Sequence, residues 1–134
     1  MKNISVTGAL DHADAIGLMR NADVIVSPSR DEALPVVILE ALSLGKALVA
    51  TTVGGVLEIL VDGEDALLVR PEAPEALAAA LRRLLENPDL IPQLAAGARQ
   101  TYERQFTLDR FGRDFRALID EAISLAAHRS AVSE

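Results

Sequence analysis

Hydrophobic and polar positions divide the chain into two parts with different patterns. Over residues 1–70, short apolar runs rich in β-branched residues alternate with helix-length segments, and glycine or proline separates them. The pattern predicts four strands, at Ile4–Ala9, Asp23–Ser27, Ala47–Thr51 and Ala66–Val69. It predicts helices between them, at Asp14–Asn21, Pro35–Leu44 and Val56–Val61. Strands that alternate with helices in this way indicate an α/β fold with a parallel sheet.

The second part of the chain, residues 71–127, has the pattern of helices alone. Leucines at spacings of three and four form one apolar face, and a second apolar face follows an Asn-Pro break. Thr107 is a good N-cap for a third helix, and Phe106 and Phe111 occupy the positions of a hydrophobic staple around it. The polar tail 128–134 is expected to fray. We therefore interpret the chain as a single partial domain.

Composition narrows the classes of partner. The 134 residues suffice for one domain with a real core. The net charge of −7, without a cluster of basic residues, argues against nucleic acid or an anionic membrane as the main partner. The absence of cysteine excludes disulfides and fits a reducing compartment. Glu40, Lys46 and Glu58 interrupt the apolar stretches too soon for a membrane segment, and no signal peptide is evident. We expect a cytoplasmic protein.

Glu40 stands in a helix that is otherwise almost wholly apolar. The seven apolar residues around it, from Val36 to Leu44, point in nearly every direction around the helix axis. A carboxylate in such a helix needs a partner or a cleft that opens to water. Alternatively, Glu40 and Ser43 share one solvated stripe. The pattern alone leaves both interpretations open.

Glu32 precedes the same helix in a polar loop where charge is ordinary. The loop follows a predicted buried strand, so it lies at the carboxyl end of that strand, where ligands of open α/β sheets bind. Pro35 suits the first helical position, because its missing N–H has no partner there anyway. The N–H groups of Val36 and Val37 then lack intrahelical partners and can attract phosphate. A nucleotide-sugar carries both hydroxyls for the carboxylates and phosphates for the amides.

The stretch PSRDEALPVVILEALSLGKALVATTVGGVLEILVDGEDALLV resembles the C-terminal domain of retaining group 1 glycosyltransferases, a family built from two facing Rossmann-like domains. The ordered set of matching positions comprises Glu32, Glu40, Gly45, Gly54, Gly55, Glu58, Asp62 and Gly63. The resemblance implies a partial Rossmann-like parallel sheet of about four strands with flanking helices and a helical C-terminal segment, the C-terminal half of a GT-B-type enzyme.

The resemblance also implies roles for single residues. Glu32 is expected to meet hydroxyls of the donor sugar and is the catalytic candidate. Glu40 is expected to hold the two ribose hydroxyls, since a carboxylate has two acceptor oxygens. The amides of Leu34, Val36 and Val37 are expected to lie near the donor sugar and its diphosphate. The partner is thus a nucleotide-diphosphate sugar, and hexosyl transfer would retain the anomeric configuration.

Two residues of the loop depart from the family pattern. Ala33 stands where glycine is frequent, and it adds strain if that position needs a positive φ. It is nevertheless expected to belong to the donor-binding loop. Pro35 replaces another common glycine and removes one amide donor.

The chain also lacks the family's first two strands, whose Arg and Lys clamp the diphosphate, and the N-terminal acceptor domain. Arg30 and Lys46 match neither clamp position, and we interpret them as a solvated loop residue and a surface residue. We expect a truncated piece or split product that binds donor weakly and catalyses nothing alone, and that needs the missing domain or a partner chain. Either the strand Ile4–Ala9 slides beside Asp23–Ser27 or a strand edge stays open. We expect self-association, by exchange of that first strand.

Other functions have less support. One alternative is a non-catalytic binding or assembly subunit with a glycosyltransferase-like fold, and another is a related nucleotide-sugar enzyme such as an epimerase. No cofactor or metal is expected. His12 and His128 lie in polar settings and are interpreted as surface residues, and the acids of the Asp62–Asp65 turn as solvated.

Overall fold

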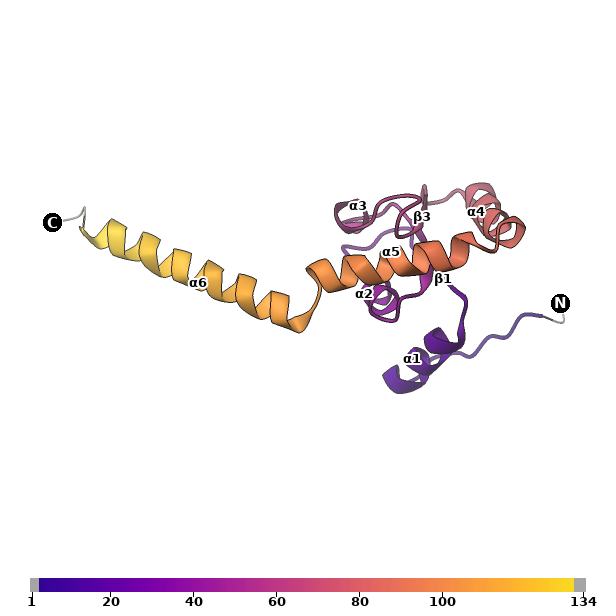
Figure 1. Ribbon diagram of the computed structural model, residues 1–134, viewed down its shortest axis with the longest axis horizontal. Coiled ribbons are helices and arrows are strands. Elements are labelled where there is room, and N and C mark those ends of the chain that lie inside the picture. The colour runs from indigo at the N-terminus through magenta and orange to yellow at the C-terminus, as the bar shows by residue number, and fades with distance from the viewer. Residues whose placement is uncertain (1–2, 132–134) are drawn as a thin grey trace.

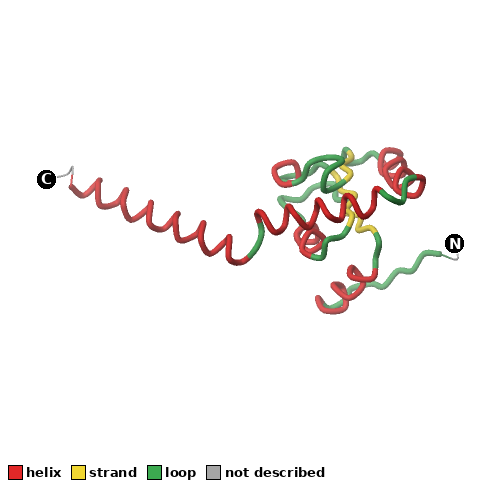
Figure 2. The backbone as a smooth tube through the Cα atoms, in the orientation of Figure 1, coloured by secondary structure: helices red, strands yellow, loops and turns green. Residues whose placement is uncertain are grey.

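The computed structural model describes residues 3–131, with side chains as far as Leu125 (Figures 1 and 2). The elements in chain order are α1 (His12–Asn21), β1 (Val24–Ser27), α2 (Val36–Ser43), β2 (Ala47–Thr51), α3 (Val56–Ile59), β3 (Leu67–Val69), α4 (Pro74–Glu86), α5 (Leu90–Gln105) and α6 (Leu108–Ala131). The predicted α/β architecture is confirmed.

The sheet of the described residues has three parallel strands in the order β1-β2-β3. Val24 pairs with Ala47, and Val49 pairs with Leu67. Every residue of the central strand β2 is buried, as the continuous apolar run predicted. All three strands therefore end at one carboxyl edge, where the loops after them meet.

Two apolar clusters cover the faces of the sheet, because successive side chains of β2 point to opposite sides. Leu48 and Ala50 pack with α2 and α3 residues in one cluster. Ala47 and Val49 pack with α4 in the other. Helix α5 contributes to both clusters, and Figure 1 shows it crossing the body of the molecule.

The predicted strand Ile4–Ala9 is wrong. Residues 3–10 are exposed and form no strand, and Figure 1 shows them running away from the sheet. Ile4 and Val6 are 67% and 89% exposed. A β-branched run becomes a strand only when a neighbouring strand pairs with it, and no described segment does so here. Of the two arrangements considered for β1, the open edge is the one observed, since β1 pairs with β2 alone within the described part.

Local signals for helix ends are confirmed in two places. Gly45 has φ +60° after α2, and Lys46 N–H donates to Ala41 O at 3.0 Å, which is the geometry of a Schellman stop. Thr107 Oγ1 accepts a hydrogen bond from Arg110 N–H at 3.3 Å and thus caps α6. At the start of α6, the rings of Phe111 and Phe115 stack with centroids 5.7 Å apart.

Helix α6 extends beyond the body of the molecule (Figure 1). Its large apolar side chains are exposed, among them Leu108, Phe111, Phe115 and Leu118. Its backbone is helical to Ala131, and the remainder of the tail expected to fray, residues 132–134, lies outside the described residues. Within the described residues, none of the helices has the length and apolar character needed to cross a bilayer.

Candidate functional site

The loop between β1 and α2 is fixed at its start by Thr51. This threonine ends β2, is buried, and donates from Oγ1 to the carbonyl oxygen of Ser29 at 2.6 Å. A longer contact, 3.3 Å, joins the same hydroxyl to Ser27 O. The hydroxyl thus ties the loop to the carboxyl end of the central strand. Glu32, in the following part of the loop, is exposed at this edge.

The turn Gly54-Gly55 packs directly against the backbone of this loop and supports it. Gly55 N–H donates to Ala33 O at 2.7 Å. A Cβ on Gly54 would lie 2.0 Å from Glu32 O and 2.2 Å from Ala33 O, so only glycine permits this approach. Gly54 also has φ +49°, a conformation that side chains disfavour. The two glycines therefore shape the backbone that carries Glu32.

Ala33 carries no backbone strain. Among the described non-glycine residues only Glu72 has a positive φ, so the substitution of alanine for the family's frequent glycine is accommodated without a left-handed conformation. Pro35 is buried and occupies the N-cap position, one residue before the first helical position predicted for it.

The amino end of α2 presents free hydrogen-bond donors. Ile38 N–H donates to Pro35 O at 3.0 Å, but within the described residues no hydrogen bond reaches the N–H groups of Val36 and Val37. No side chain caps this end either. Val36 is 66% exposed and Val37 is half-buried, so this end of the helix lies at the surface. The predicted pair of free amides is thus present, at the positive end of the helix dipole.

Glu40 lies one turn further along α2. Its side chain is 24% exposed, and its Oε1 lies 2.8 Å from Nε2 of His12. The neighbouring residues Ile38 and Ala41 are fully buried on the core side. The sequence indicated that a carboxylate in this apolar helix needs either a polar partner or access to solvent. The Glu40 carboxylate has both.

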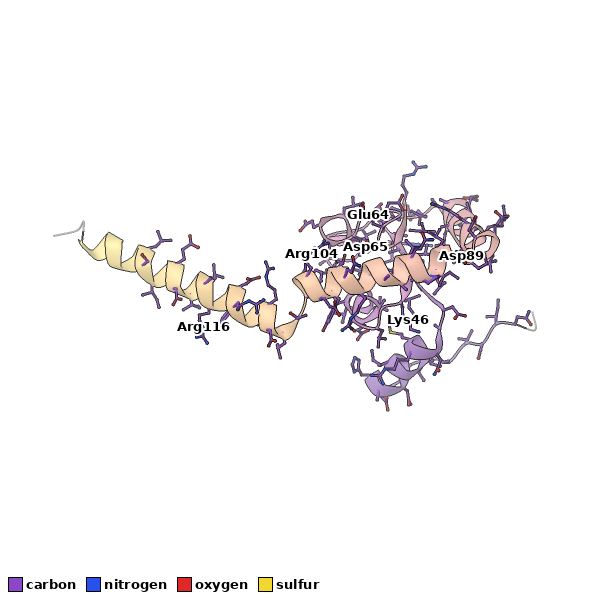
Figure 3. All side chains as sticks on the ribbon, in the orientation of Figure 1. Lys46, Glu64, Asp65, Asp89, Arg104 and Arg116 are labelled. Carbon is purple, nitrogen blue, oxygen red and sulfur yellow. The ribbon has the colours of Figure 1, made fainter. Side chains whose placement is uncertain are left out.

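Helix α1 is attached beside α2 at both of its ends. His12, its first residue, contacts Glu40, and the last turn is held by Lys46, whose Nζ donates to Arg20 O at 2.6 Å. Figure 3 labels Lys46 between α2 and α1. The amino end is capped by Asp11, whose carboxylate accepts from Asp14 N–H at 2.9 Å. These contacts fix the place of His12 relative to α2.

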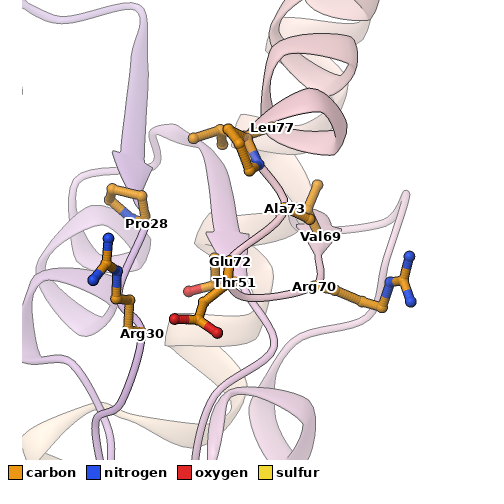
Figure 4. A pocket seen from close by; sticks show the side chains of 9 residues that line it. Pro28, Arg30, Thr51, Val69, Arg70, Glu72, Ala73 and Leu77 are labelled. Carbon is orange, nitrogen blue, oxygen red and sulfur yellow. The ribbon is translucent and has the colours of Figure 1, made fainter.

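A hollow of about 270 Å³ opens at the same carboxyl edge. It is lined by residues at or just after the ends of all three strands, among them Arg30, Thr51 and Glu72 (Figure 4). The carboxylate of Glu72 points toward the middle of the hollow, whereas the guanidinium of Arg70 extends away from it. Glu72 has φ +55°, a costly conformation for a non-glycine residue.

The structure brings the predicted site residues to one region. Glu32, Ala33 and Leu34 share the loop after β1, and Val36, Val37 and Glu40 occupy the first turns of the helix that follows. Glu58, on α3, lies after the glycine turn that supports the loop. The described residues contain no group of three or more His, Asp or Glu arranged to hold a metal ion.

Sequence reasoning missed three contributions to this region. His12 was interpreted as a surface residue, and it is exposed, but it contacts Glu40 across 28 positions. Lys46 was interpreted in the same way and holds α1. Arg30 is exposed, as expected, but it also lines the hollow. No local periodicity connects His12 with Glu40, so only the fold reveals their contact.

Comparisons with known proteins give several matches to this chain. Residues 1–101 match the family model described as "Glycosyl transferases group 1". The chain is 35% identical over 99 residues to a glycogen synthase of Mycobacterium tuberculosis, and the match covers 74% of this chain and 24% of that protein. It is 36% identical over 121 residues to a D-inositol 3-phosphate glycosyltransferase of Salinispora tropica, covering 90% and 24%. The chain thus spans about a quarter of the length of these relatives.

Solved structures show the same fold. The chain superposes on a sucrose-phosphate synthase of Thermosynechococcus elongatus with a TM-score of 0.82 and 27% identity, over 92% of this chain and 31% of that one. A glycosyltransferase of Rickettsia africae superposes with a TM-score of 0.76 and 28% identity, over 83% and 30%. These neighbours have the GT-B architecture, so the partial Rossmann-like assignment is confirmed.

Proposed function

The chain belongs to the group 1 glycosyltransferases, and from that premise we propose that its carboxyl edge binds a nucleotide-diphosphate sugar. In this proposal the chain is the donor-binding part of an enzyme that transfers a hexosyl group with retention of configuration. The observation that carries the proposal is the arrangement at α2: unpartnered N–H groups of Val36 and Val37, with a partly exposed Glu40 one turn further.

Each ligand group has a complementary protein group in this arrangement. The diphosphate is negative and accepts hydrogen bonds, so it suits the free amides of Val36 and Val37 at the positive end of α2. The vicinal ribose hydroxyls donate hydrogen bonds, so they suit the carboxylate of Glu40. Glu32, exposed in the loop that Gly54 and Gly55 support, is assigned to hydroxyls of the donor sugar. The amide of Leu34 and the backbone of Ala33 complete this wall of the proposed site.

We further propose that the isolated chain binds the donor weakly and does not catalyse transfer. Transfer requires an acceptor held against the anomeric carbon, and the family resemblance implies that a second domain holds it. It also implies basic residues that neutralise the leaving diphosphate. Stabilisation of the charge on a leaving group contributes much of the rate of such reactions. Without those basic residues, turnover by the isolated chain is expected to be abolished.

The proposal is tested by two-dimensional amide NMR of the ¹⁵N-labelled chain, titrated separately with UDP, GDP and ADP. At least one nucleotide should shift the amide signals of Val36 and Val37, with saturation in the micromolar to millimolar range. The variant Glu40→Gln should weaken that binding about tenfold to a hundredfold, because a hydrogen bond to a charged group is worth about 1.5–3 kcal/mol.

Glu58→Gln is the matched control, since Glu58 is an exposed acid on the adjacent α3 and has no assigned ligand group. It should leave nucleotide affinity unchanged. Titrations that leave the α2 signals in place, or an effect of Glu58→Gln as large as that of Glu40→Gln, would contradict the assignment. Release of free sugar or transfer to an added acceptor by the isolated chain would refute its proposed inactivity.

A further inference from the structure

His12 is the feature of this region that the family resemblance does not assign. It lies on α1, 28 positions before Glu40, and its Nε2 approaches Glu40 Oε1 to 2.8 Å. We propose that His12 is a positioning residue: it holds the Glu40 carboxylate in the orientation that receives the two ribose hydroxyls. The inference rests on the proposed function, since it concerns how Glu40 performs the role assigned there.

The chemistry of the contact leaves room for a ligand. An ionised carboxylate only accepts hydrogen bonds, so Nε2 of His12 is the donor in this pair. Each carboxylate oxygen has two acceptor positions. The imidazole uses one position on Oε1 and leaves the other, together with both positions on Oε2, for a vicinal diol. The contact therefore orients the group without occupying it.

Glu40 needs such a partner because little else restrains it. A glutamate side chain has several rotatable bonds, and its ordering is unfavourable in entropy. Glu40 is partly exposed, and His12 is the partner that the structure records for its carboxylate among the described side chains. A group ordered before the ligand arrives binds more tightly, because less freedom is lost on binding.

Contacts within α1 and between α1 and Lys46 restrain His12. Asp11 caps α1 at the residue before His12, and Lys46 holds the last turn of α1 through Arg20 O. The histidine thus begins a capped helix whose last turn is attached through Lys46, and α1 contains no fully buried residue. His12 itself is 79% exposed. Exposed ion pairs add little to stability, so a role in holding the fold together does not explain this contact.

The experiment compares ribose with its dideoxy analogue. The probe is whichever of UDP, GDP and ADP binds most tightly, together with the 2′,3′-dideoxy form of the same nucleotide, and both affinities are measured by NMR titration of the full chain. The wild type should prefer the ribonucleotide. His12→Ala should lower ribonucleotide affinity about threefold to tenfold and leave the dideoxy affinity unchanged, since only the diol contact is affected.

Three further variants make the result specific. His12→Gln retains an N–H donor at a similar reach, so it should restore most of the preference for ribose. Asp14→Ala, on the same exposed turn of α1, should change neither affinity. The double variant His12→Ala with Glu40→Gln should bind no more weakly than Glu40→Gln alone, because the histidine acts through the glutamate.

The outcomes separate the inference from the proposed function. Loss of ribose preference in Glu40→Gln but not in His12→Ala overturns the inference and leaves the proposed function standing. Equal weakening of both nucleotides by His12→Ala indicates a purely structural role and also overturns it. Unchanged ribose preference in Glu40→Gln overturns the proposed function, and the inference with it.

Discussion

Thr101 Oγ1 donates a hydrogen bond to Asp65 Oδ2 at 2.9 Å, and both side chains are buried. The other carboxylate oxygen accepts from Val61 N–H at 2.8 Å. Helix α5 approaches this turn so closely that a Cβ on Gly97 would lie 2.1 Å from Glu64 O, and Figure 3 labels Asp65 against α5. The turn before β3 is therefore fastened to α5 by a buried carboxylate with both oxygens satisfied.

Removing one side of this contact should destabilise the fold. Thr101→Val leaves a buried carboxylate oxygen without its donor, so we expect a loss of about 1–3 kcal/mol in the free energy of unfolding. Urea unfolding followed by circular dichroism measures it. Asp62→Ala is the control: Asp62 also accepts from a backbone N–H, that of Leu68, but in an exposed position, so its loss should be smaller. Equal losses in both variants would contradict the importance of burial.

Substitutions at Gly54 and Gly63 form a matched pair that tests the role of the Gly54-Gly55 turn. Both have positive φ, +49° and +79°, but a Cβ on Gly63 would meet no atom within 4 Å. Gly63→Ala should therefore cost only the left-handed conformation, about 1–2 kcal/mol. Gly54→Ala should cost about 3 kcal/mol or more, because it also displaces the Glu32 and Ala33 carbonyls.

The same pair tests whether the turn shapes the candidate site. In amide NMR spectra, Gly54→Ala should shift the signals of residues 32–34, whereas Gly63→Ala should leave them in place. If both variants lost the same stability and left that loop unperturbed, the support that we attribute to the glycine turn would be absent.

Elements with strong local signals were predicted well. Ala47–Thr51 has the same bounds in the sequence pattern and in the structure, because a continuous buried run has only one place in the centre of a parallel sheet. The helix predicted at Val56–Val61 ends earlier, at Ile59, since Leu60 is already extended with φ −114° and ψ 141°. The free amides of Val36 and Val37 followed from helix geometry alone.

Features that depend on distant residues were not predictable. Ile4–Ala9 has the composition of a strand, but pairing decides whether a strand forms, and none of the described segments pairs with it. Asp65 was interpreted as part of a solvated turn, yet it is buried because Thr101, 36 positions later, supplies its partner. The contact of His12 with Glu40 is of the same kind.

The strained backbone at Glu72 predicts that glycine is the better residue there. With φ +55°, a side chain costs about 1–2 kcal/mol, and glycine removes that cost while making the unfolded chain more flexible. We expect Glu72→Gly to raise the free energy of unfolding by about 0.5–1 kcal/mol. Glu72→Ala, which keeps the Cβ and removes the carboxylate, should not stabilise. Destabilisation by Glu72→Gly would indicate that the carboxylate, which faces the hollow, itself stabilises the fold.

Self-association of the chain is the last prediction. The stacked Phe111 and Phe115 are 62% and 53% exposed on α6. In the described part of the chain, no strand pairs with the outer edge of β1, where Val26 is 37% exposed. Apolar surface and open strand edges both favour pairing with a second copy. Light scattering after size exclusion should therefore give a mass above that of the monomer, increasing with concentration.

Two variants distinguish the surfaces. Phe111→Ser with Phe115→Ser removes the aromatic pair from α6, and Val26→Lys places a charge on the strand edge, a substitution that natural edge strands use against pairing. Helix-mediated association should be lost in the first variant alone. Edge-mediated association, including the exchange of the segment Ile4–Ala9 between copies, should be lost in the second alone. A monomeric mass for the unmodified chain at high concentration would refute the prediction, because neither exposed surface would then attract a second copy strongly enough to matter.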